Sequence, residues 1–410
     1  MTHSPPPVPG RAVPPGQLSW LEGELRTWEG EGLLDPAAAE VIRARYVAVR
    51  RFSLVRLLLV LGAAFVGVGL IWVVATNLDR LAPLARFLLV AAIWLSLLVG
   101  SEVLAARRGI GDERRSPALG AARLLAALAF GAVVFQAAQS LQVPAYEPRL
   151  LGVWGLGALV QAYAVRGLMP LLLGIGVASG WYVWQVAESA DSALGFVAAV
   201  LTGGVVISAL ALLHRSSWLR GAGLPRSFEV AWREAGALLV LVGLFAAALP
   251  HLDAHGFRWS ASLVAGLALG AVSMAAAVAG VDDRWSRLEL LVPVVALVIG
   301  SGLVLWDAGI EDVRYLSGAA YAKVVVGVLV YLATAAWFAV LGVLRDSTRL
   351  TVIAALALVV FTTVQAFAVF APIVSGATLF LVVGGVLVVS GFTVDRGRRQ
   401  LTRAVEAGAP

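Results

Sequence analysis

Long apolar runs dominate the chain from Leu54 onward, and each run is bounded by Arg, Pro or acidic residues. A helix needs about 20 mostly apolar residues to cross the hydrocarbon core of a bilayer. The pattern therefore predicts an all-α, polytopic membrane bundle of about twelve transmembrane helices. The expected spans are 54–75, 84–105, 118–139, 150–165, 168–186, 193–213, 235–250, 259–280, 288–306, 319–343, 350–371 and 373–392.

The segment before the first apolar run has an amphipathic pattern. Leu18, Leu21, Leu25 and Trp28 recur at helical spacing with acidic and basic residues between them. Asp35-Pro36 is typical of the start of a second helix, with Asp as the N-cap and Pro at the first helical position. We predict a cytoplasmic helical hairpin over residues 17–50, preceded by a disordered, Pro-rich tail over residues 1–16.

The composition agrees with a membrane protein and excludes several other classes. Hydrophobic residues make up 60% of the chain and charged residues 14%, against about 25% charged in a soluble domain. This balance excludes a soluble enzyme and a nucleic-acid-binding domain. The absence of cysteine excludes disulfides and Cys-type zinc sites, and the lone lysine follows Ala322 rather than Gly, so no P-loop is present. We predict no cofactor.

Basic residues indicate the orientation of the predicted spans. If the N-terminus is cytoplasmic, 25 of the 31 basic residues fall on the cytoplasmic side and five fall in the opposite loops. Such a bias is expected from the positive-inside rule, and a missed span would invert every later loop. We predict both termini in the cytoplasm. The strong preference for Arg over Lys suggests a bacterial cytoplasmic membrane.

The longest loop divides the predicted bundle into two halves. The expected organisation is a first six-helix half over 51–213, a cytoplasmic connector over 214–234, a second half over 235–393 and a basic cytoplasmic tail over 394–410.

The N-terminal segment resembles a known family. The residues that carry the resemblance are Leu25, Trp28, Gly32-Leu33-Leu34-Asp35, Ile42, Tyr46 and the helix end Ala75-Thr76-Asn77-Leu78-Asp79. This pattern, over roughly residues 18–165, is similar to the prokaryotic membrane proteins grouped as domain of unknown function 2157, with Leu78 in place of the family's Trp. The resemblance makes Trp28, Gly32, Tyr46, Asn77 and Asp79 family-motif positions, and it implies an architecture rather than a chemistry.

Polar residues inside the predicted spans are candidate substrate-binding residues, since a central charge costs about 2.5–3.5 kcal/mol there. Lys323 lies near the outer end of the tenth span, where it either binds an anion or extends to the interface. Glu102 lies near the inner end of the second span and either binds protons or pairs with Arg107 or Arg123. Amides on four other spans would line a polar path if they converge, and would otherwise make hydrogen bonds between helices. They are Gln136, Gln161, Gln185 and Gln365.

One outer loop carries potential metal ligands. His251, Asp253 and His255 alternate along the chain, as ligands in a turn would. An exposed polar loop has the same pattern, and we predict no metal site. His214, beside Arg215, is expected to be an interface residue.

Three functions remain open. Twelve helices with short loops and both ends inside favour a transporter or permease for a small solute or a lipid. A membrane scaffold or sensor would instead bind a protein partner through a hairpin with an exposed stripe of Leu21, Leu25 and Trp28. An envelope enzyme acting on a lipid-linked substrate would need Asp79, Asp253 and a His to converge.

Overall fold

The computed structural model describes residues 11–13, 15–48, 54–77, 82–109, 113, 116–144, 146–249, 252–281, 283–308 and 318–365. These residues fall into two compact units, Met1–Gly62 and Ala63–Pro410.

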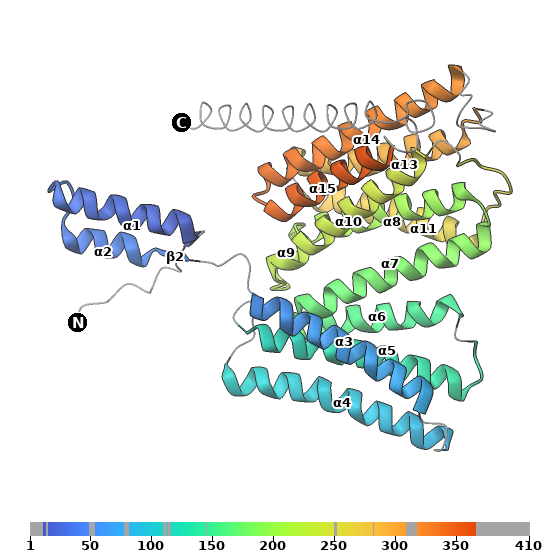
Figure 1. The fold of residues 1–410 in the computed structure, drawn as a ribbon, viewed down its shortest axis with the longest axis horizontal. Helices are drawn as coiled ribbons and strands as arrows, with labels where there is room; N and C mark the ends of the chain where they lie inside the picture. The colour runs from blue at the N-terminus through green and yellow to red at the C-terminus, as the bar shows by residue number, and fades with distance from the viewer. Residues whose placement is uncertain are drawn as a thin grey trace, which may run out of the picture. The chain divides into compact units, whose positions relative to one another are not determined.

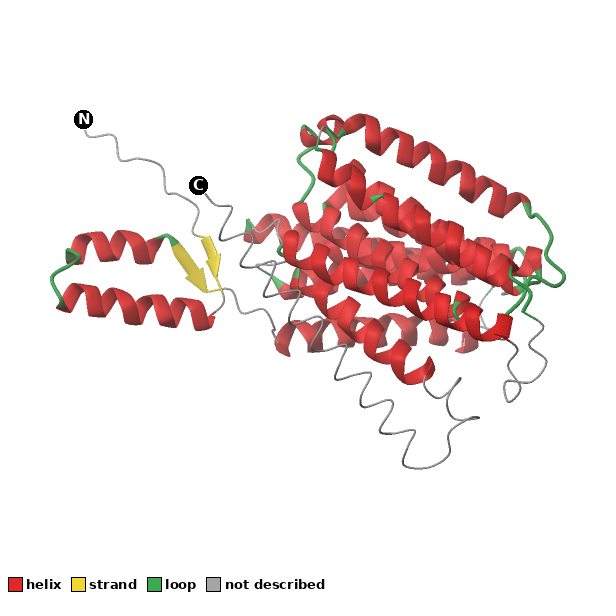
Figure 2. Ribbon diagram, turned by 90° about the horizontal axis from the view of Figure 1, so that it is seen from above, coloured by secondary structure: helices red, strands yellow, loops and turns green. Residues whose placement is uncertain are grey.

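The first unit is a helical hairpin closed by a short sheet. Helices α1 (Pro15–Gly30) and α2 (Pro36–Ala44) are joined by a turn in which Gly32 has a φ of +71°. As predicted, Asp35 is the N-cap of α2 and Pro36 starts the helix. Strands β1 (Arg11–Val13) and β2 (Tyr46–Ala48) pair in parallel (Figure 2). Arg11–Val13, which lie in the tail expected to be disordered, pair with β2.

The apolar stripe of this hairpin is mostly internal. Leu25 is fully buried, as is Ala39 of α2, while Leu21 and Trp28 are half-buried. The exposed stripe that a scaffold was expected to present is therefore wrong for Leu25. The exposed large apolar side chains of the hairpin are instead those of Trp20, Leu33 and Val41.

The rest of the described chain is helical. Helix α3 (Leu54–Asn77) begins in the first unit and ends in the second. The remaining helices are α4 (Pro83–Arg108), α5 (Pro117–Ser140), α6 (Pro148–Val165), α7 (Leu168–Ala190), α8 (Ala193–Leu213), α9 (Ser217–Arg220), α10 (Arg226–Ala247), α11 (Ala261–Gly280), α12 (Arg284–Glu289), α13 (Leu291–Leu305), α14 (Gly318–Leu344) and α15 (Thr348–Gln365).

These helices confirm an all-α polytopic membrane bundle. Within the described ranges, nine helices are long and apolar enough to cross a membrane. Helices also lie where the first eleven predicted spans were expected, whereas the twelfth, 373–392, is outside the described residues.

The seventh span differs most from its prediction. Helix α10 begins at Arg226, nine residues before the expected 235, so it takes up the end of the predicted connector. The charges of 226–234 favour a loop in the sequence. In the structure this segment is helical: Phe228 and Trp232 pack in the core, and Arg233 pairs with Glu229 one turn away.

Helices α8 and α10 form the centre of the second unit. Each of α4 to α7 packs against the next helix, and α8 also contacts α10, α11 and α13 (Figure 1). Tyr331 of α14 stacks on Phe361 of α15, with ring centroids 3.7 Å apart.

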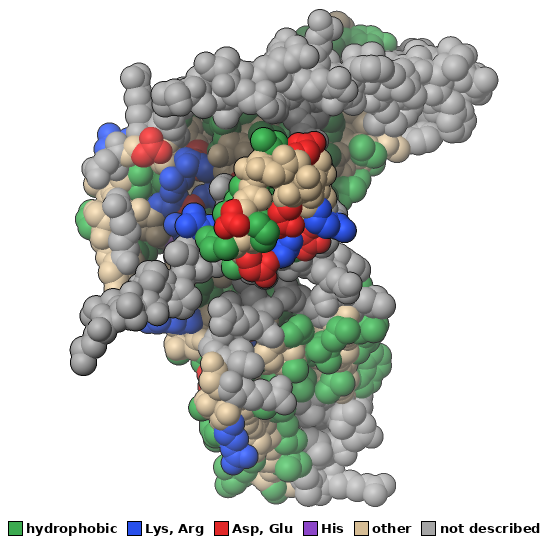
Figure 3. All heavy atoms as spheres, turned by 90° about the vertical axis from the view of Figure 1, so that its left-hand side faces the viewer, with side chains coloured by type: hydrophobic (Ala, Val, Ile, Leu, Met, Phe, Trp, Pro, Cys, Tyr) green, Lys and Arg blue, Asp and Glu red, His purple; other side chains and the backbone are tan. Residues whose placement is uncertain are grey.

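By contrast, many large apolar side chains on other helix faces are exposed, among them Val160, Val272 and Val298. Figure 3 shows green, apolar side chains gathered in patches on the face in view. An exposed apolar surface of this extent suits contact with lipid.

Glycines let α6 and α7 approach closely. A Cβ at Gly155 would lie 2.7 Å from the backbone nitrogen of Ala178, and one at Gly174 would lie 2.9 Å from that of Leu159. Small residues commonly allow such contacts between membrane helices.

Substituting Gly155 with Ala is expected to lower the free energy of unfolding by about 1–3 kcal/mol, because α6 and α7 would have to move apart. Reversible unfolding in mixed micelles measures this change. Gly176→Ala on α7 is the matched control, since a Cβ there meets no atom within 4 Å. Equal effects of the two substitutions would contradict the close contact.

Candidate functional site

A buried arginine organises one end of helices α4, α5 and α7. The side chain of Arg123, on α5, is 3% exposed. Its Nε and Nη2 donate to the two carboxylate oxygens of Glu102 on α4, each at 2.8 Å. A bidentate pair of this kind is among the strongest hydrogen-bonded arrangements that side chains form. Of the two alternatives for Glu102, the structure has the ion pair with Arg123.

Glu113 completes this ion triad from the loop between α4 and α5. Its Oε1 lies 3.5 Å from Nη1 of Arg123. Its Oε2 accepts hydrogen bonds from the backbone N–H groups of Leu168 and Met169, at 3.0 and 3.1 Å. These two groups belong to the first turn of α7, whose positive dipole end favours a carboxylate. Burial nevertheless raises the pKa of Glu113, against the opposing effects of these hydrogen bonds and of Arg123.

A lateral groove of about 680 Å³ lies beside the triad, between α4, α5 and α6. Its walls are apolar apart from Glu102, Gln161 and the indole of Trp94. The lining residues of α4 run from Trp94 to Ala106, which corresponds to about 18 Å along the helix axis. The groove is therefore elongated and apolar, with a carboxylate near one end.

Gln161 contributes the second polar group of this groove. Its amide nitrogen donates to the backbone oxygen of Arg123 at 3.1 Å. A carbonyl oxygen can only accept, so the amide nitrogen must face α5 and Oε1 is left as an acceptor.

The other predicted amides do not join Gln161. Gln136 is buried on α5, where its amide nitrogen lies 3.5 Å from the Ser140 hydroxyl. Gln365 donates to the backbone oxygen of Ala248 at 3.4 Å. Gln185 is half-buried on α7. Because Gln161 and Gln365 bond to separate backbone groups, the described amides do not form the common polar path that was considered.

Lys323 is buried near the start of α14. Its Nζ donates to the backbone oxygen of Leu252 at 3.0 Å. The Lys323 ammonium is thus bound to a backbone group within the protein. It does not extend to the membrane interface, which was one of the two alternatives predicted from the sequence.

The loop between α10 and α11 forms a small local contact. Nδ1 of His255 lies 2.8 Å from Oδ2 of Asp253, and both side chains are exposed. This hydrogen bond raises the pKa of His255, while the backbone N–H of His255 lowers the pKa of Asp253. His251 is outside the described residues, and no group of three or more potential ligands occurs within them.

The family-motif residues lie in the hairpin and at the end of α3. The backbone oxygen of Trp28 accepts hydrogen bonds from Leu33 and Leu34, beside Gly32. Tyr46 lies opposite Arg11 in the sheet, and Asn77 ends α3. Asp79 is outside the described residues, so its convergence with Asp253 stays a prediction.

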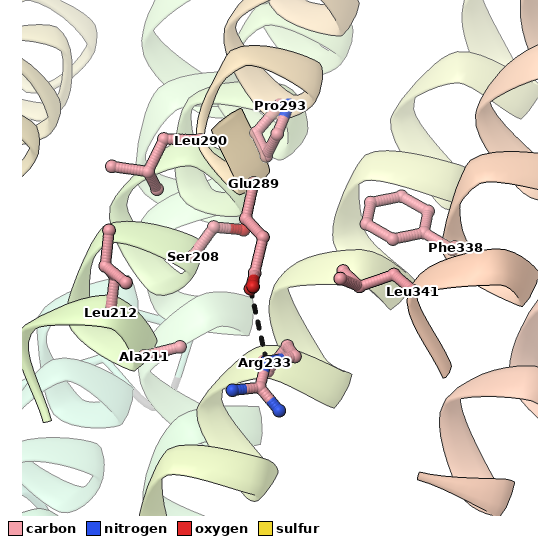
Figure 4. Close-up of a pocket in the computed structure, with 9 residues that line it drawn as sticks. All are labelled: Ser208, Ala211, Leu212, Arg233, Glu289, Leu290, Pro293, Phe338 and Leu341. Atoms are coloured by element: carbon pink, nitrogen blue, oxygen red, sulfur yellow. Dashed lines mark ion pairs between the residues drawn. The ribbon is translucent and has the colours of Figure 1, made fainter. Parts of the chain in front are cut away.

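A second ion cluster surrounds Glu289, at the ends of α8, α10, α12 and α14. Arg345 donates from Nε to Oε1 of Glu289 at 2.6 Å and from Nη2 to the Ser286 hydroxyl at 2.9 Å. Arg215 and Arg233 each place a guanidinium nitrogen 3.6 Å from the same carboxylate. Figure 4 shows Glu289 and Arg233 pointing toward each other beside a cavity of about 20 Å³. Such a cavity holds about one water molecule.

Side chains from α6, α10 and the end of α8 form a chain of hydrogen bonds. The indole N–H of Trp232 donates to the Tyr163 hydroxyl at 3.0 Å, and this hydroxyl lies 2.8 Å from Nε2 of His214. Nδ1 of His214 lies 2.7 Å from the backbone oxygen of Leu210, so Nδ1 carries the proton. Nε2 then accepts from Tyr163. Burial lowers the pKa of His214, although the Leu210 carbonyl and Glu229 oppose the shift.

Acidification is therefore expected to destabilise the fold through His214. The unfolded chain binds the proton near the ordinary pKa of about 6.5, whereas the folded chain binds it only at a lower pH. Stability should fall as the pH drops through about 6.5 and level off below the folded pKa. The melting temperature between pH 8 and 5 measures this loss. His214→Gln should have a flatter profile, and an unchanged profile would contradict the assignment.

Sequence reasoning missed Glu113 and the partners of Glu289. One signal for Glu113 was available: Gly167, the N-cap of α7, offers no side chain to cap the helix. The first N–H groups of α7 therefore need acceptors from outside this N-cap, and a carboxylate from another part of the chain is one candidate. The sequence held a weaker signal for the Glu289 cluster. Charged residues are common at the ends of apolar runs, so their presence does not indicate which of them pair.

One family model matches the part of the chain that contains the triad and the groove. Residues 26–171 match the family described as Predicted membrane protein (DUF2157). This confirms the resemblance expected from the N-terminal motifs. The DUF2157 segment includes Glu102, Glu113, Arg123 and Gln161, and its apolar helices identify a membrane protein that lies in a lipid bilayer. No curated protein and no solved structure matches this chain.

Proposed function

We propose that this protein binds an amphiphile from the bilayer in the α4–α5–α6 groove and acts as a permease-like carrier for it. The groove is the observation that supports this function. Its volume of about 680 Å³ is within the range of about 300–1,000 Å³ that is common for ligand pockets. Its length of about 18 Å is close to half of the ~30 Å hydrocarbon core, which is the depth of one acyl chain. In this proposal both termini lie in the cytoplasm of a bacterium.

A lipid suits the groove better than a small polar solute does. A polar solute needs several polar side chains around one cavity, but neither Gln136 nor Gln365 is among the residues that line the groove. The groove offers a long apolar wall and one polar end. This division of the surface matches a molecule with an acyl chain and a headgroup.

Filling the groove tests this function. Val160→Trp places a large side chain at a lining position of α6 that is 70% exposed. We expect native mass spectrometry of the protein, purified in mild detergent, to find bound lipid on the wild-type chain and at least about tenfold less on this variant, since the indole would occupy space the acyl chain needs.

The matched control is Val153→Trp, two helical turns away on the same face of α6 and outside the groove. Val153 is also exposed, so the two variants differ mainly in their distance from the groove. Equal lipid retention by both variants would rule out the groove as the binding site.

A further inference from the structure

The polar end of the groove presents a carboxylate rather than a guanidinium to a ligand. Glu102 lines the groove and its side chain is 38% exposed, whereas the side chain of its partner Arg123 is 3% exposed and is not part of the lining. Glu102 is also the one charged residue that lines the groove. A headgroup that enters therefore meets negative charge first.

Both polar groups at this end retain capacity to accept a hydrogen bond. A carboxylate has about four lone-pair sites, and Glu102 has three described donors: Nε and Nη2 of Arg123, and the Ser101 hydroxyl at 3.4 Å. The Oε1 of Gln161 is the second acceptor, because its amide nitrogen is bound to α5. Both residues bind Arg123. Glu102 accepts from the Arg123 side chain, and Gln161 donates to the Arg123 backbone oxygen. The groove therefore contains, near one end, two hydrogen-bond acceptors, and the donor groups that bind Glu102 and the amide nitrogen of Gln161 lie on the protein side.

We propose that the groove selects phospholipids with a primary-amine headgroup, whose ammonium binds between Glu102 and Gln161 while one acyl chain lies along α4. An ammonium has three N–H donors and a positive charge, which complement two acceptors and a carboxylate. A quaternary ammonium has the charge without the donors, and an anionic headgroup would be repelled by Glu102. This inference rests on the proposed function and adds the headgroup class.

The choice of lipid can be measured on the full wild-type chain. Nanodiscs containing equal amounts of phosphatidylethanolamine, phosphatidylcholine and phosphatidylglycerol, with identical acyl chains, provide the three probes. After extraction into mild detergent, native mass spectrometry counts the lipid retained by each protein molecule. We expect phosphatidylethanolamine to exceed each of the other two about tenfold, as one charge-assisted hydrogen bond would give. Equal retention of the three lipids, or a preference for phosphatidylglycerol, would overturn the proposal.

Two variants connect this preference to Glu102. Glu102→Gln should still retain one lipid but lose the headgroup preference, whereas Glu188→Gln, which removes an exposed carboxylate on α7 away from the groove, should keep it. Should Glu102→Gln fail to fold because Arg123 loses its partner, the wild-type comparison of phosphatidylethanolamine with phosphatidylcholine decides alone.

Failure of this inference and failure of the proposed function have different signatures. If Val160→Trp loses bound lipid but the wild-type chain shows no headgroup preference, the groove binds lipid and the amine selection is wrong. If Val160→Trp retains as much lipid as the wild-type chain does, the proposed function itself is wrong.

Discussion

Substituting Arg123 with Ala is expected to lower the free energy of unfolding by about 3–5 kcal/mol, because two carboxylates would be left without their shared guanidinium. Glu102 would lose a bidentate partner at 2.8 Å, and the buried Glu113 would lose a partner at 3.5 Å. The substitution would also remove the ion pair that links α4 to α5 at this end of the bundle. Steric trapping or reversible unfolding in micelles measures the loss.

Arg149→Ala is the control for this substitution. Arg149 also forms an ion pair, with Glu147 at 3.5 Å, but its side chain is 80% exposed. Exposed pairs typically contribute less than about 1 kcal/mol, so the control should be close to the wild-type chain. Similar losses for the two arginines would show that the Arg123 triad contributes little to stability.

The second large effect is expected from Glu289→Gln. This substitution keeps the size of the side chain but removes the negative charge that faces Arg215, Arg233 and Arg345. Three guanidinium groups would then lie close together with fewer carboxylates to balance them, in a site where the Glu289 side chain is only 12% exposed. Breaking a buried pair by removing one partner typically costs about 3–5 kcal/mol. We expect a loss of that size in the free energy of unfolding.

A double-mutant cycle separates this charge effect from a packing effect. If the charge of Glu289 stabilises the fold through Arg345, the loss from Glu289→Gln should be smaller when Arg345 is already replaced by Met. Glu188→Gln, on the exposed surface of α7, should leave stability nearly unchanged. Additive losses for Glu289 and Arg345 would contradict direct coupling between them.

The helices of this protein could be predicted from the sequence because a bilayer leaves few alternatives. Lipid offers no hydrogen bonds to a backbone, so an apolar run long enough to cross must satisfy its backbone internally as a helix. The apolar segments thus predicted the helices of the second unit closely. The start of α2 was also predictable, because Asp35-Pro36 acts through its own local backbone geometry. The start of α10 was not, because its charged first turns have the composition of a loop.

The polar contacts were decided by the tertiary structure. Helical spacing fixes which residues are neighbours within about four positions, but Glu113 binds Leu168 and Met169, which are more than 50 residues away. The sequence by itself determined that the chain is a membrane helix bundle with a helical hairpin before it. Whether Glu102 would pair with Arg107 or Arg123, and which amide would line a cavity, depended on how α4, α5 and α6 pack. Apolar helices can pack in lipid in many ways, because lipid chains and apolar side chains are nearly equivalent neighbours. The sequence of any single segment therefore does not predict how these helices are arranged. It also does not predict the groove that this arrangement leaves beside Arg123.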